Sequence, residues 1–237
     1  MEESGADYDT VLVDLQDKPT DFVELYARAN PMKDARAKVP VLHVVRPKEE
    51  DVVLCESLVV AEYVAELFGN NVEDGFLLPH SLEDRAKMKL FTELCSPCFS
   101  YFPILRERGD KLESAIEKFK EGLVNADALL TRLGGQNQKG PFLFGTRFSL
   151  AECNLAPFVQ RACTVLPAFT TQESSGRPVN PISICEELGL VRLKEWIEAI
   201  IARPSVVKTS VPKDEMVKNM AKMLERFKVM EEGKQQS

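Results

Sequence analysis

Residues 39–57, VPVLHVVRPKEEDVVLCES, contain the pattern that decides the fold of this chain. Residues 39–45 and 52–55 are short runs of β-branched and other apolar residues, separated by the charged residues 46–51. Such a pattern predicts two strands joined by a hairpin connection. Residues 57–68 then have the apolar spacing typical of a helix, and Gly69 follows as a stop signal. The stretch therefore predicts a β-hairpin that leads directly into a helix.

The segments on either side of this stretch differ in kind. On the N-terminal side, residues 10–15 (TVLVDL) have the composition of another strand, and residues 20–29 have an apolar helix face. On the C-terminal side no strand pattern appears, and helices are expected at residues 82–108, 111–133, 149–166, 186–202 and 211–230. Pro79 lies between the N-terminal and the C-terminal segments and marks the expected boundary. We expect an α/β plus all-α fold, with an α/β domain at residues 1–78 and an all-helical domain at residues 79–237.

Composition excludes several classes of protein. The net charge of −7 argues against binding to nucleic acid or to an anionic membrane, since both need a basic face. No apolar run approaches the roughly 20 residues needed to cross a bilayer, and residues 1–9 are polar, unlike a signal or transit peptide. The six cysteines are scattered through apolar stretches, which indicates reduced thiols and a cytoplasmic location. We expect no metal site, because the only histidines, His43 and His80, have no acidic partner at an informative spacing.

Five short motifs occur in a characteristic order along the chain. They are L-x-x-K-P at residues 15–19, VPVL at residues 39–42, the pair Glu56-Ser57, LLP at residues 77–79, and S-L-A-E at residues 149–152. In this order they resemble the glutathione S-transferases, most closely the omega and lambda classes. The resemblance implies a thioredoxin-like N-terminal domain and an all-helical C-terminal domain. Within the last motif, Ser149 and Glu152 have the spacing of a capping box, which is a folding feature.

The resemblance also implies a glutathione site. The Val39–Pro40 peptide bond would be cis, which presents the backbone of Val39 to the cysteinyl backbone of glutathione. Glu56 and Ser57 would bind the γ-glutamyl carboxylate at a helix start, with Ser57 as N-cap, and Lys18 would bind the glycine carboxylate. The alternatives are an ordinary strand start at Pro40, a cap without a ligand at Ser57, and a solvated lysine at position 18.

The catalytic residue is not identified. In the family it lies between the first strand and the first helix, and residues 1–9 are too short to supply these elements. The thioredoxin-like domain is therefore expected to be incomplete, and residues 10–15 would lose their partner strand. The sequence is expected to be a fragment of a longer protein, which could also carry a targeting peptide. The alternative is that another segment or another chain fills the gap.

Two cysteine features are interpreted as structural. Cys95-Ser96-Pro97-Cys98 has the C-x-x-C form of a redox motif, but it follows a helical run instead of a strand. Cys55 lies on an apolar strand, and we expect it to be a core residue. The methionines of residues 211–230 are expected to pack in the core, with lining of a second-substrate pocket as the alternative.

The function implied by the resemblance is that of a glutathione-dependent transferase or thiol transferase/reductase of omega/lambda-like type. Glutathione would be the cosubstrate, and the other substrates would be small electrophiles, disulfides or glutathione conjugates, in detoxification or redox chemistry. The expected partners are glutathione and a small hydrophobic or thiol-containing substrate. The resemblance leaves both a homodimer, which is usual in the family, and a monomer open. The alternative is a non-catalytic binding or scaffold protein that keeps the transferase fold.

Overall fold

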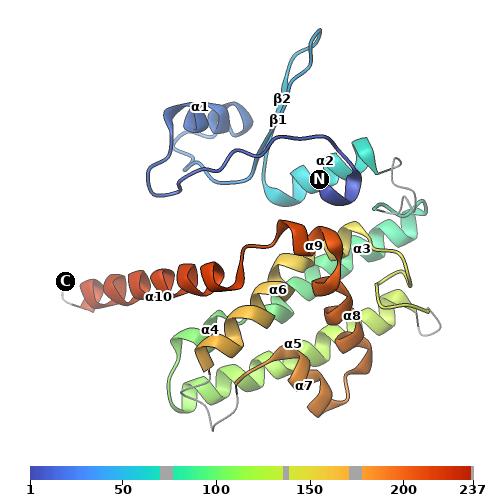
Figure 1. Ribbon diagram of the computed structural model, residues 1–237, viewed down its shortest axis with the longest axis vertical. Helices are drawn as coiled ribbons and strands as arrows, with labels where there is room; N and C mark the ends of the chain where they lie inside the picture. Colours follow the sequence, from blue (N-terminus) through green and yellow to red (C-terminus); the bar gives the residue numbers. More distant parts are fainter. Residues whose placement is uncertain (70–76, 136–138, 171–177, 236–237) are drawn as a thin grey trace. The chain divides into compact units, whose positions relative to one another are not determined.

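The chain forms two compact units, Met1–Leu78 and Pro79–Ser237 (Figure 1). The structure is a computed structural model that describes residues 1–69, 77–135, 139–170 and 178–235, with side chains as far as residue 230. The polar run of residues 170–181 has the composition of a long loop, and residues 171–177 of it lie outside the described residues.

The first unit is built on an antiparallel β-hairpin. A short 3-10 helix η1 (Glu2–Ser4) and helix α1 (Thr20–Ala29) precede strands β1 (Val41–Val44) and β2 (Val52–Cys55), and helix α2 (Ser57–Phe68) follows. Val41 pairs with Cys55, and Val44 with Val52. This confirms the predicted hairpin and helix, with β1 starting two residues later than expected.

Helices α1 and α2 both pack against the hairpin, and Figure 1 shows them on different sides of it. Phe22 and Tyr26 of α1 are buried in a small cluster to which Val41 and Cys55 contribute. Facing residues of an antiparallel ladder have their side chains on the same face of the sheet, so this register gives α1 a continuous apolar surface to cover. Cys55 is therefore a core residue, as expected.

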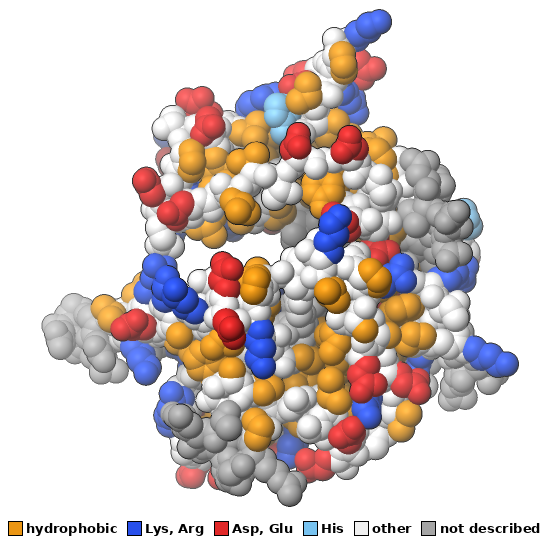
Figure 2. Space-filling view, in the orientation of Figure 1, with side chains coloured by type: hydrophobic (Ala, Val, Ile, Leu, Met, Phe, Trp, Pro, Cys, Tyr) orange, Lys and Arg blue, Asp and Glu red, His pale blue; other side chains and the backbone are white. Residues whose placement is uncertain are grey.

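The strand predicted at residues 10–15 is wrong. Within the described residues the sheet has two strands only, and this segment belongs to neither. Val11 and Leu12 are 83% and 92% exposed, and Figure 2 shows hydrophobic side chains on the surface of this unit. The N–H of Gln16 donates to the Asp14 carboxylate at 2.8 Å and turns the chain. A β-branched sequence forms a strand only where a neighbouring strand accepts its backbone hydrogen bonds.

The second unit is helical. Its elements are α3 (Leu82–Cys95), the 3-10 helix η2 (Ser96–Phe99), α4 (Phe102–Arg106), α5 (Asp110–Gly134), α6 (Leu150–Thr170), α7 (Pro181–Leu188), α8 (Val191–Ala202), α9 (Pro204–Thr209) and α10 (Lys213–Gln235).

Two of the predicted helices are divided in the structure. The helix expected at residues 82–108 consists of α3, η2 and α4, because Pro97 and Pro103 cannot donate the backbone hydrogen bonds of a continuous helix. The helix expected at residues 186–202 is divided between α7 and α8 at Gly189, which ends α7 with a left-handed φ of 68°.

The core of the second unit is organised around Trp196 on α8. Its ring is fully buried and packs edge-to-face on Phe91 at 5.8 Å between centroids. The indole Nε1–H donates to Glu152 at 3.1 Å. The same buried carboxylate accepts hydrogen bonds from the backbone N–H and the hydroxyl of Ser149 and from the N–H of Leu143. The predicted capping box is present in part: Glu152 accepts from the Ser149 N–H as expected, but the Ser149 hydroxyl accepts from the N–H of Ala151 and not from that of Glu152. The glutamate also connects α6 to α8 and to the preceding loop.

Candidate functional site

Two motifs that lie 16 positions apart in sequence are placed at the same end of the hairpin. The pairing of Val41 with Cys55 puts Val39-Pro40, just before β1, beside Glu56-Ser57, just after β2. The Val39–Pro40 peptide bond is cis, as the resemblance implied. Val39 is 48% exposed and lies outside the ladder, so its backbone is not used in pairing β1 with β2.

The start of α2 differs from the predicted arrangement. Ser57 was expected as the N-cap, but the cap is Glu56 and Ser57 is the first helical residue. Glu56 has φ 69° and ψ 115°, a backbone conformation that is strained for a residue with a side chain. This turn sends the chain from β2 straight into the helix with no intervening loop. Strained residues of this kind cluster at binding sites. The sequence named Glu56 as a candidate binding residue but gave no sign of its strained backbone.

The N-terminus of α2 is open to an anion. No side chain caps it, its first turn contains no acidic residue, and residues 56–59 are exposed. By contrast, α3 is capped by the Ser81 hydroxyl, which accepts from the N–H of Asp84, and its first turn carries two acidic residues. The first N–H groups of a helix have no partner within the helix and form a positive end that suits a carboxylate. The uncapped start of α2 therefore favours a ligand that carries a carboxylate.

Lys18 belongs to the same unit but to a different element. It is half-buried and lies next to Pro19, which caps α1. Because α1 packs against both strands, the structure brings Lys18, the Val39–Pro40 turn and the Glu56–Ser57 turn into one small unit. Nothing in the structure tests the ligand roles predicted for these residues.

The hairpin carries a hydrogen-bonded His–Asp pair that the sequence pattern did not reveal. His43 Nε2 lies 2.8 Å from Asp51 Oδ2, and the other carboxylate oxygen accepts from the N–H of Arg46. The bond to His43 and then that to the Arg46 N–H lower the pKa of the Asp51 carboxyl. Arg46 also donates to the hydroxyl of Tyr63 on α2 at 3.2 Å, which links the hairpin connection to the helix. Spacing alone could not show this pair, because it depends on the hairpin register.

The structure shows the surroundings of five of the six cysteines. The Cys55 side chain packs on the α1 cluster. Burial raises the pKa of the Cys95 and Cys98 thiols, and the Cys98 thiol contacts the carbonyl of Leu94 at 3.4 Å. Burial also raises the pKa of Cys163 and Cys185 to about 12. These findings agree with a structural role for the C-x-x-C segment and for Cys55.

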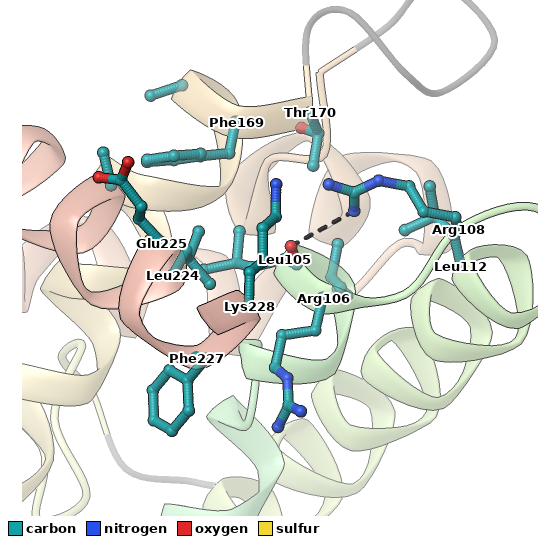
Figure 3. A pocket seen from close by; sticks show the side chains of 13 residues that line it. Leu105, Arg106, Arg108, Leu112, Phe169, Thr170, Leu224, Glu225, Phe227 and Lys228 are labelled. Atoms are coloured by element: carbon teal, nitrogen blue, oxygen red, sulfur yellow. Dashed lines mark hydrogen bonds between the residues drawn. The ribbon is translucent and has the colours of Figure 1, made fainter. Parts of the chain in front are cut away.

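A separate pocket of about 590 Å³ lies within the second unit (Figure 3). It is formed by α4 and the residues that follow it, the end of α6, and α10. The helix α10 contributes Leu224 and Phe227 to the lining, and no methionine of α10 is part of it. The methionines of α10 do not line this pocket, and their lining of a second-substrate pocket stays a prediction.

Over the described ranges, no three His, Cys, Asp or Glu side chains are grouped as metal ligands. No helix in the described part of the chain is both long and apolar enough to cross a bilayer.

The fold and the site together define a two-unit protein of thioredoxin-like and helical type. Residues 1–67 match the family model of the glutathione S-transferase N-terminal domain, and residues 110–199 match that of the C-terminal domain. The chain belongs to the glutathione S-transferase family.

Solved structures agree with this assignment. Glutathione transferase Omega 1C from Trametes versicolor is 26% identical, with a TM-score of 0.64 over 94% of this chain and 88% of that chain. Omega 2S from the same organism, solved with 2,4-dihydroxybenzophenone, is also 26% identical, with a TM-score of 0.58 over 93% and 89%. A Tau class transferase from the mango Mangifera indica shares the fold, with 18% identity and a TM-score of 0.65 over 94% and 89%. No curated protein sequence matches the chain.

Proposed function

We propose that the first unit binds glutathione and that the protein is a glutathione-dependent transferase or thiol transferase/reductase of omega/lambda-like type. The observation that carries this proposal is the hairpin register, which puts the exposed backbone of Val39 beside the uncapped N-terminus of α2. Family membership supports the same ligand, since the family is named for it.

Each end of glutathione has a matching group in this unit. The γ-glutamyl carboxylate is assigned to the free N–H groups at the start of α2, where the helix dipole favours a negative charge. The cysteinyl backbone is assigned to the N–H and C=O of Val39, which extend the hairpin as an added strand would. The glycine carboxylate is assigned to the ammonium of Lys18. Glu56 holds the turn that exposes the helix start.

The proposed reaction is attack by the glutathione thiolate. On a small electrophile it forms a carbon–sulfur bond and expels the leaving group. On a disulfide it forms a mixed disulfide and releases the other sulfur as a thiolate. On a glutathione conjugate it attacks the conjugate's sulfur, which forms glutathione disulfide and releases the reduced compound after uptake of a proton. A hydrophobic or aromatic second substrate is supported by the Trametes versicolor Omega 2S structure, which holds 2,4-dihydroxybenzophenone. The omega-like relatives support the class assignment at 26% identity.

A second function, glutathione binding without catalysis, is favoured by the state of the thiols. Cys55 is packed in a core, and burial raises the pKa of the four other cysteines named above. A high pKa keeps a thiol protonated and unreactive near neutral pH. An assay of glutathione-dependent thiol transfer separates the two functions: turnover supports the enzyme, and binding without turnover supports the scaffold.

Calorimetric titration of glutathione into the Ser57→Glu variant tests the proposed site. The new carboxylate lies at the start of α2, where it favours the helix but repels the γ-glutamyl carboxylate. We expect glutathione affinity to fall about tenfold or more, because a charge-assisted hydrogen bond contributes about 1.5–3 kcal/mol. Asn125→Asp is the matched control, since it adds the same charge at an exposed position of α5. Equal binding by both variants would place glutathione elsewhere.

A further inference from the structure

Helices α5 and α10 of the second unit each carry an exposed face with a regular pattern of charge. Both faces have three charged residues at intervals of four positions, followed by a valine three positions later. Residues at this spacing lie on one side of a helix. They form an acidic ridge on α5 (Glu113, Glu117, Glu121 and Val124) and a basic ridge on α10 (Lys218, Lys222, Arg226 and Val229).

Both ridges are open to solvent. All eight of their residues are exposed, and Val124 and Val229 are 44% and 65% exposed. The helix α10 packs on α6, whereas α5 packs on α3, η2, α4 and α8. Neither ridge is therefore used in holding the second unit together.

The charges of the two ridges are largely uncompensated within the chain. Among the side chains that the structure describes, none forms a hydrogen bond or ion pair with Lys218, Lys222 or Arg226. On α5, Glu117 lies 2.9 Å from Lys120, but a surface pair of this kind contributes little. Like charges four positions apart on a helix repel each other. A partner that presents the opposite charge at the same spacing relieves this repulsion on both ridges at once.

A second copy of this chain is the partner that the two ridges fit. It supplies the opposite charge at the matching spacing, and an apolar counterpart for each of the two valines. Nucleic acid and anionic membranes also carry negative charge, but the net charge of −7 opposes their approach to this chain. Charge complementarity therefore favours the second copy.

We propose that the basic ridge of α10 docks on the acidic ridge of α5 in a second copy of the chain. A two-fold axis forms the contact twice, once in each direction, and closes the pair. Individual surface charge pairs contribute little, so the association is weak and depends on salt. All eight residues belong to Pro79–Ser237, and the association does not depend on glutathione binding by the first unit.

Sedimentation velocity of the full chain at low and high salt tests for this association. We expect a concentration-dependent shift to a larger species at low salt, and its loss at about 1 M sodium chloride, where the screening length is about 3 Å. Absence of a salt-sensitive step would overturn the proposal. Binding to phosphatidylserine vesicles through Lys218 and Lys222, without self-association, would also overturn it and would assign the basic ridge to a membrane.

Charge reversal of each ridge tests the location. We expect Lys218→Glu/Lys222→Glu and Glu113→Lys/Glu117→Lys each to weaken self-association about tenfold or more, because like charges then face each other. An equimolar mixture of the two variants is expected to restore it, since each ridge of one variant then meets the opposite charge on the other. Restoration also shows that both variants are folded. A mixture that stays dissociated would contradict the pairing of the two ridges.

The matched control is Lys111→Glu/Lys118→Glu, which makes the same change in net charge as Lys218→Glu/Lys222→Glu. Both lysines are exposed on α5 outside the acidic ridge, and we expect their reversal not to weaken self-association. A loss equal to that of Lys218→Glu/Lys222→Glu would show that association responds only to net charge, and would overturn the assignment to these ridges.

Discussion

Glu152 shows how much one side chain can hold together in this protein. It is fully buried, and its two oxygens accept hydrogen bonds from Ser149, Leu143 and Trp196. A buried carboxylate is costly unless donors surround it, and here the donors come from three separate segments of the second unit. The Glu152 carboxylate therefore fits this core only where these three segments come together and supply its donors.

Replacement of Glu152 by alanine is expected to lower the free energy of unfolding by about 3–5 kcal/mol, because several buried donors lose their acceptor. Urea unfolding followed by far-ultraviolet circular dichroism measures this change. The control is Glu195→Ala on the exposed side of α8, for which a change within about 0.5 kcal/mol is expected. A loss of less than about 1 kcal/mol for Glu152→Ala would show that water replaces the carboxylate readily.

The family resemblance gave part of the candidate site. Lys18, Val39, Pro40, Glu56 and Ser57 were found from the family resemblance, and the cis bond was confirmed. The strained φ of Glu56 and the pairing of His43 with Asp51 were not found, because both depend on how the hairpin closes. The charged lining of the second pocket was also missed, since Arg108 and Lys228 are 120 positions apart in sequence.

At the scale of elements, α5 and η2 pack with their backbones close together. A Cβ atom at Gly122 would lie 2.7 Å from the carbonyl oxygen of Cys98. Glycine inside a helix ordinarily costs about 1 kcal/mol relative to alanine. Its presence here is explained by the close approach of the C-x-x-C segment, which makes that segment a packing element.

The variant Gly122→Ala is expected to lower the free energy of unfolding by about 1–2 kcal/mol, because the clash with rigid backbone outweighs the gain in helix propensity. Thermal and urea unfolding measure the sign and the size. Asn125→Ala on the exposed surface of the same helix is the control, and a small stabilisation is expected there. A stabilised Gly122→Ala variant would contradict the close packing of η2 on α5.

Element boundaries show where local patterns are sufficient. Helix α1 and helix α2 begin and end where the sequence predicted, because each has a clear apolar face and a clear stop. The helix expected at residues 82–108 was wrong because its apolar spacing continues through Pro97 and Pro103. The strand expected at residues 10–15 was wrong because strand formation depends on a partner, which propensity does not supply.

At the scale of the whole molecule, the proposed glutathione site belongs to one of the two compact units. Glutathione is assigned to residues of Met1–Leu78. A ligand that binds only the folded protein stabilises it by RT ln(1 + [L]/Kd).

Glutathione at 100 times its Kd is therefore expected to raise the free energy of unfolding by about 2.7 kcal/mol. Urea unfolding with and without glutathione measures the change. No change at saturating glutathione would contradict binding to the folded protein.

The sequence by itself determined the fold class, the family resemblance, and the hairpin and helix that contain the candidate glutathione site. These follow from short-range patterns, since apolar periodicity, turn residues and motif order are properties of neighbouring positions. Only the tertiary structure decided that Glu56 caps α2 in a strained conformation, that Glu152 holds Trp196, and that Arg108 and Lys228 line one pocket. Each of these depends on contacts between segments distant in sequence, whose distances and burial exist only once the chain has folded.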